Sequence, residues 1–202
     1  MENRLAEIHR KTRETDVRLF LDLDREIGSG GEGPETIQTG IGFLDHMLIL
    51  FARHSGFGLL VEAAGDTHVD CHHTMEDVGI VLGSAIAKAA GTKEGIARYG
   101  SAVVPMDEAL VMVVVDLGGR PYYAGDAVFF GQRIGEMDTQ MMGEFFKAVA
   151  FNGLFNLHIQ VIRGGNDHHV AEAIFKAFGR ALAAALTRDP RVQGVLSTKG
   201  VL

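Results

Sequence analysis

The chain of 202 residues contains one cysteine, Cys71, and no basic tract. A single thiol excludes an internal disulfide framework and favours a reducing compartment. Because the formal net charge is −7, binding to nucleic acid or to an anionic membrane surface is disfavoured. We expect a cytoplasmic protein whose partners are small molecules.

Long hydrophobic runs are absent as well. The longest apolar stretches, such as ALVMVVV at residues 109–115, are much shorter than a membrane span. Residues 1–25 alternate charged and apolar side chains, a pattern that predicts neither a signal peptide nor a transit peptide. Hydrophobic residues still make up 47% of the chain, so one domain or two small halves can bury a substantial core.

One stretch is rich in glycine, namely GSGGEGP at residues 28–34. It lacks the Gly-Lys-Ser/Thr that leads a phosphate-binding loop into a helix. We therefore predict a mobile connection here and no nucleotide site.

The apolar pattern predicts the same order of elements twice. Alternation with period two predicts strands, and longer amphipathic segments that end at glycine predict helices. The first round has strands at residues 6–12 and 17–24, a helix at 43–56, a strand at 57–63 and a helix from the first histidine pair to residue 90. The second round has a strand within residues 108–125 that turns at glycines 118 and 119, a helix at 139–153, a strand at 154–162 and a helix at 168–186.

Matched positions indicate an internal duplication. The separation of His72 from His168 equals that of Glu76 from Glu172, and helix-ending glycines repeat at nearly the same distance. We therefore predict an α+β fold of two similar halves whose helices pack between two sheets around one shared core. The predicted halves are residues 1–95 and 96–202, joined within residues 91–101.

The duplicated motifs DCHHTMED and NDHHVAEA carry the chemistry. Residues four apart on a helix share a face, whereas neighbours diverge by about 100°. In each motif the first histidine and the glutamate can therefore bind one ion, while the second histidine serves another. The pairs are His72 with Glu76 and His168 with Glu172, and the second histidines are His73 and His169.

Imidazole and carboxylate together suit zinc, manganese, iron, cobalt or nickel. A lone histidine pair at a helix start is more often a cap or a surface feature, but its repetition at equivalent places favours metal binding. The order of residues differs from the HExxH of zinc peptidases. His46 and Glu144, at matched positions on the preceding helices, are candidates for further ligands.

Symmetry then suggests how the ligands divide between two ions, with contributions from different subunits left open. The first set is His46, His73, His168 and Glu172, and the second is Glu144, His169, His72 and Glu76. Each set has one carboxylate, so a divalent ion keeps a net positive charge and an open position for a ligand.

Four segments, GIGFLDHML, DCHHTMEDVGI, NDHHVAEAIFKAFGRAL and the closing LSTKGVL, resemble the imidazoleglycerol-phosphate dehydratase family over residues 10–202. The resemblance implies halves that each have a four-stranded sheet with helices. It also implies a homo-oligomer of 24 subunits with active sites between subunits and two Mn²⁺ per active site, bound by the same eight residues.

The implied reaction removes water from D-erythro-imidazoleglycerol phosphate and yields imidazole acetol phosphate. The carbon-bound proton has no adjacent carbonyl to acidify it, so the resemblance implies that the imidazole ring drives out the hydroxyl while the metals act as Lewis acids and template. The implied catalytic residues are Glu14, His46, His72, Glu76, His168 and Glu172, with Glu14 as the acid or base that moves substrate protons.

Phosphate binding is assigned by the same resemblance. The implied residues are Arg98, Arg120, Ser197, Thr198 and Lys199, with Glu14 also placed at the substrate. The chain departs from the family pattern in the glycine-rich loop and at Gly165, where glutamate or lysine is common. Without the resemblance, the metal clusters alone would also permit a di-metal hydrolase or a ferritin-like metal store.

Overall fold

The computed structural model describes residues 4–25 and 36–200. The glycine-rich stretch at residues 28–34 lies outside the described residues, so the prediction of a loop there stays a prediction. No helix in the described part of the chain combines the length and the apolar character of a membrane span.

The first sheet has the strand order β1-β2-β4-β3. Its strands are β1 (Leu5–Lys11), β2 (Thr15–Asp22), β4 (Gly58–Gly65) and β3 (Ile37–Gln38). The first three are antiparallel neighbours, and β3 lies parallel to β4 at the edge. Along β2 the apolar residues Val17, Leu19 and Leu21 are buried, as the period-two alternation predicts.

The second sheet repeats this arrangement with the order β5-β6-β10-β7. Its strands are β5 (Tyr99–Met106), β6 (Ala109–Asp116), β10 (Asn156–Arg163) and β7 (Tyr122–Gly125). β7 runs parallel to β10, as β3 does to β4. β5 was not predicted as a strand, because it alternates exposed with half-buried residues and includes a proline; only a joint at residues 91–101 was expected where it begins. A small hairpin of β8 (Arg133–Ile134) and β9 (Met137–Asp138) precedes the third helix.

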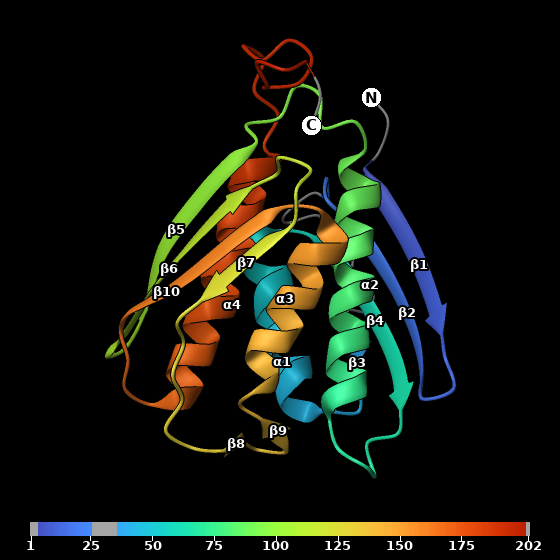
Figure 1. The fold of residues 1–202 in the computed structure, drawn as a ribbon, viewed down its shortest axis with the longest axis vertical. Coiled ribbons are helices and arrows are strands. Elements are labelled where there is room, and N and C mark those ends of the chain that lie inside the picture. The colour runs from blue at the N-terminus through green and yellow to red at the C-terminus, as the bar shows by residue number, and fades with distance from the viewer. Residues whose placement is uncertain (1–3, 26–35, 201–202) are drawn as a thin grey trace.

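In the described part of the chain, four helices fill the space between the two sheets (Figure 1). They are α1 (Gly42–Ser55), α2 (His72–Ala90), α3 (Met141–Gly153) and α4 (Asp167–Leu186). α2 packs on β1 and β2, and α4 packs on β5 and β6, while α1 contacts α4 and α3 contacts α2. The predicted α+β duplication with helices between the sheets is confirmed. The shorter helix of each half therefore packs against the long helix of the other half, α1 on α4 and α3 on α2.

Two glycines at matched positions allow these helices to approach closely. A Cβ on Gly83 of α2 would lie 2.4 Å from the backbone oxygen of Val149 in α3, and one on Gly179 of α4 would lie 2.8 Å from that of Phe51 in α1. Stacked phenylalanines fill the core beside the second contact, where the rings of Phe51 and Phe178 are 5.2 Å apart. This close packing sets the distance between side chains on α1 and α4. The predicted boundary between residues 95 and 96 lies in the segment that joins α2 to β5.

Candidate metal centre

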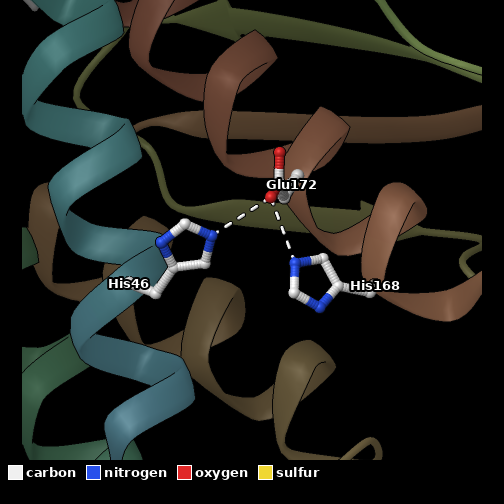
Figure 2. A group of neighbouring side chains, drawn as sticks. All are labelled: His46, His168 and Glu172. Carbon is white, nitrogen blue, oxygen red and sulfur yellow. Dashed lines mark hydrogen bonds and ion pairs between the residues drawn. The ribbon is translucent and has the colours of Figure 1, made fainter.

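The ends of α1 and α4 bring three predicted ligands together. The Nε2 atoms of His46 and His168 each lie 3.1 Å from Oε1 of Glu172 (Figure 2). His46 belongs to the first half of the chain and the other two residues to the second. The crossing of helices between the halves is therefore what forms this group.

A lysine holds the other oxygen of the same carboxylate. Nζ of Lys176 donates to Oε2 of Glu172 at 2.6 Å. Burial raises the pKa of Glu172, but hydrogen bonds from Lys176, His46 and His168 outweigh it and lower the pKa to about 2. Glu172 is therefore ionised at neutral pH and has one oxygen directed at both imidazoles.

This donor set fits a divalent transition ion. The three donor atoms lie within 4.8 Å of one another, and two imidazole nitrogens with one carboxylate oxygen form a ligand set that manganese, iron, cobalt, nickel and zinc accept. His46 and His168 also have exposed faces, so a further ligand could reach an ion there.

The duplicated counterpart of this group lies on α2 and α3. Nε2 of His72 is 3.7 Å from Oε2 of Glu76. His72 and Glu144 line the same cavity, whose volume is about 790 Å³. Arg133 and Glu136 line it as well. His72 and Glu144 therefore lie on the wall of one cavity that has room for a ligand.

Local capping explains why both motifs begin their helices alike. The carboxylate of Asp70 accepts the backbone N–H of His72 at 2.7 Å, and the side chain of Asn166 accepts that of His168 at 2.9 Å. An acceptor two residues before the first histidine satisfies an otherwise unpaired donor of the first helical turn. Each pair of histidines is thereby held on the first turn.

The second histidines have other partners. Nδ1 of His73 lies 3.0 Å from Oδ2 of Asp66 and 3.8 Å from Oε2 of Glu14. Nδ1 of His169 lies 2.9 Å from Oε2 of Glu108. The hydrogen bond that the ring donates to Asp66 raises the pKa of His73, and the one donated to Glu108 raises the pKa of His169.

One chain thus assembles part of each predicted set of four. The structure brings His46, His168 and Glu172 together but leaves the fourth member, His73, beside Asp66. On the other side, His169 bonds to Glu108 and does not join the second set. Within the described residues of a single chain, neither set of four is complete.

The candidate phosphate residues gather only in part. Arg98 has a left-handed backbone with φ of 68°, and its guanidinium is held by the carboxylate of Asp116 at 2.7 Å. The same guanidinium donates to the backbone oxygen of Leu196 at 2.6 Å, next to the segment with Ser197, Thr198 and Lys199. Arg120 is exposed and follows β6, and no contact of its side chain with the segment is seen in the described residues.

Sequence reasoning missed four residues that contact the site. Lys176 lies four positions after Glu172, so helical spacing could have indicated it. Asp66, Glu108 and Asp116 accept hydrogen bonds from His73, His169 and Arg98. No local pattern in the sequence marks those three contacts.

The chain is similar to known proteins over its whole length. The sequence model described as imidazoleglycerol-phosphate dehydratase matches residues 39–182. The imidazoleglycerol-phosphate dehydratase of Acetivibrio thermocellus is 54% identical over 200 residues, which cover 99% of this chain and 100% of the relative. That of Streptococcus gordonii is 53% identical over 199 residues, which cover 98% and 100%.

Two solved structures share the fold. The crystal structure of imidazoleglycerol-phosphate dehydratase from Staphylococcus aureus has a TM-score of 0.80 and 43% identity, and covers 91% of this chain and 99% of that one. The structure of IGPD from Pyrococcus furiosus in complex with (S)-C348 has a TM-score of 0.80 and 35% identity, and covers 96% and 100%. The similarity therefore includes both halves of the duplication.

Proposed function

The chain belongs to the imidazoleglycerol-phosphate dehydratase family, and from this premise we propose that it removes water from D-erythro-imidazoleglycerol phosphate with two Mn²⁺ per active site. It is a hydro-lyase of histidine biosynthesis. Family membership favours this reaction over the di-metal hydrolase and the metal store that the histidine clusters alone would permit. A cytoplasmic location accords with the single cysteine.

The observation that carries the metal proposal is the convergence of His46, His168 and Glu172. Lys176 neutralises one oxygen of the carboxylate and directs the other at the imidazoles. The proposed ligands are the eight of the two predicted sets: His46, His73, His168 and Glu172, and Glu144, His169, His72 and Glu76. When bound, Mn²⁺ supplies Lewis acidity and a template for an azole ring.

Completion of each set requires another copy of the chain. His73 and His169 do not join the other proposed ligands within their own chain and bond to Asp66 and Glu108. Large exposed hydrophobic side chains such as Phe130, which is 85% exposed, and Val128, which is 76% exposed, accord with burial against neighbours. We therefore propose active sites between subunits of a homo-oligomer, and we take the number of 24 chains from the family resemblance alone. A light-scattering mass of 24 times 21.8 kDa would support this assembly, and a monomeric mass would contradict it.

The chain's own residues would handle the proton and the phosphate. Glu14 lies in the turn between β1 and β2 with 57% of its side chain exposed, and we assign to it the transfer of protons at the glycerol carbons. Arg98 contacts the backbone of Leu196, directly before Ser197, Thr198 and Lys199, and these residues with Arg120 would bind the phosphate.

A direct experiment is turnover by metal-stripped and Mn²⁺-reloaded protein. The reloaded protein should convert imidazoleglycerol phosphate to imidazole acetol phosphate, detected by mass spectrometry, and the stripped protein should not. Reloading with Mg²⁺, which prefers oxygen ligands, is the matched control. Absence of product from protein that has bound Mn²⁺ would reject the proposed reaction.

A further inference from the structure

The second histidine of each motif has a carboxylate on the same ring nitrogen. Nδ1 of His73 meets Asp66 at 3.0 Å, and Nδ1 of His169 meets Glu108 at 2.9 Å. An ionised carboxylate only accepts hydrogen bonds, so the nitrogen that faces it carries the proton. The lone pair of a neutral ring is then on Nε2, which is the tautomer that binds a metal from that side.

The two carboxylates come from different places in the duplicated fold. Asp66 is the residue directly after β4, whereas the residue directly after the equivalent strand β10 is Gly164, which has no side chain. Glu108 comes instead from the turn between β5 and β6. The equivalent turn between β1 and β2 contains Glu14, whose Oε2 lies 3.8 Å from Nδ1 of His73. The two halves therefore use the same turn differently.

Gly165 makes room for the carboxylate of the second half. A Cβ at this position would lie 2.4 Å from Cγ of Glu108 and 2.5 Å from its Oε1, which is closer than non-bonded atoms approach. That Oε1 also accepts the backbone N–H of Asn166 at 2.6 Å. Glu108 thus lies against the backbone of Gly165, where one of its carboxylate oxygens accepts the N–H of Asn166 and the other contacts Nδ1 of His169.

We propose that Glu108 is a positioning residue that fixes His169 as the Nδ1–H tautomer, with Nε2 available for Mn²⁺, and that Gly165 is required for this placement. Asp66 does the same for His73, which leaves Glu14 free to exchange protons with the substrate. The inference rests on the proposed function, because His169 is a metal ligand only within it.

Glu108→Gln separates this role from a merely structural one. The glutamine has a single acceptor oxygen, which the backbone N–H of Asn166 occupies, so its NH₂ group faces Nδ1 of His169. The ring must then accept through Nδ1 and carry its proton on Nε2, where the proton competes with the metal. Loss of such a supporting hydrogen bond typically weakens metal binding about 10–100-fold.

The experiment titrates the metal-stripped, assembled protein with Mn²⁺ and measures the free aqua ion by electron paramagnetic resonance. Wild type should bind two ions per chain tightly. In Glu108→Gln one of the two should bind about 10–100-fold more weakly, while the thermal unfolding midpoint of the metal-free protein stays unchanged. Gly165→Ala should give the same weakening, because the added methyl group displaces Glu108.

Asp107→Asn is the matched control. It removes the same charge from the same turn, and asparagine tolerates the positive φ of 47° at this position. Oδ2 of Asp107 lies 3.9 Å from Nε2 of His169, beyond hydrogen-bond distance, so the Asp107→Asn variant keeps the contact of Nδ1 with Glu108. It should bind Mn²⁺ like wild type, and a loss equal to that of Glu108→Gln would show that charge and not orientation matters. Wild-type binding by Glu108→Gln, with impairment only in Glu108→Ala, would reduce Glu108 to a structural role and overturn the inference. Failure of the wild-type chain to bind two ions would instead overturn the proposed function itself.

Discussion

Replacement of Glu172 by glutamine should remove a pH-dependent part of the stability of the metal-free protein. Glu172 is only 8% exposed. Burial raises its pKa, but the hydrogen bonds from Lys176, His46 and His168 lower it from 4.5 to about 2. At about 1.4 kcal/mol per pKa unit, this shift corresponds to about 3 kcal/mol, or about 2 kcal/mol once screening by nearby solvent is included.

The sign follows from the direction of the shift. A carboxyl group whose pKa is lower in the folded state stabilises the fold fully above its unfolded pKa of 4.5 and loses this contribution as the pH falls toward 2. Glu172→Gln should therefore be less stable than wild type by about 2 kcal/mol near pH 7. The difference should shrink steadily below pH 4.5.

Urea unfolding measures this difference in the free energy of unfolding between wild type and Glu172→Gln. The metal-stripped proteins are compared at one chain concentration and at several pH values between 3 and 7, and circular dichroism reports unfolding. Lys176→Met and the double variant complete a mutant cycle, in which removal of both partners should cost less than the sum of the single changes. A difference between wild type and Glu172→Gln that stays constant with pH, or no difference near neutral pH, would refute the electrostatic account of this group.

Three further predictions concern packing and substrate binding. Gly83→Ala should destabilise the protein by about 2 kcal/mol, because its methyl group meets a backbone oxygen of α3. Gly143→Ala, whose added methyl group would have nothing within 4 Å, should stabilise the protein slightly through helix propensity. Equal effects of the two changes on the thermal unfolding midpoint would contradict the close contact at Gly83. Asp116→Asn should raise KM about tenfold, without changing Mn²⁺ affinity, because Arg98 loses a charge-assisted hydrogen bond; an unchanged KM would separate this pair from phosphate binding. Thr74→Val should stabilise the fold by about 1 kcal/mol, since the buried hydroxyl of Thr74 has no hydrogen-bond partner among the described residues. A lower free energy of unfolding for Thr74→Val than for wild type, measured by urea denaturation, would show that the hydroxyl has a partner.

The two halves differ in which carboxylate contacts the second histidine of the motif. Both halves place a carboxylate in the first hairpin turn near a second histidine, but only Glu108 forms the short contact. Asp66 supplies that contact in the first half. The contact to the second histidine thus differs between the halves through the residue that follows a strand, Asp66 or Gly164, and through the space at Gly165.

The order of the elements, the repetition of the two halves and the family could all be determined from the sequence. These features depend on local periodicity and on motifs whose residues are close together in the chain, such as the four-residue spacing of His168 and Glu172. The main helices begin and end within a few residues of the predicted positions. Sequence patterns missed or only partly predicted three strands, namely the edge strands β3 and β7 and the half-exposed β5. Pairing with neighbouring strands stabilises them more than the alternation of apolar residues within them does.

Only the tertiary structure decided which side chains meet. The packing of α1 on α4 brings His46 to Glu172, although they are distant in the sequence, and this packing depends on small residues such as Gly179 that permit the close approach. The same holds for the carboxylates of Asp66 and Glu108, whose orientation toward a ring nitrogen is set by the end of a strand and by a turn. Spacing along a helix identifies residues that share a face. Which side chain of another helix, strand end or turn lies opposite that face depends on how the helices and sheets pack.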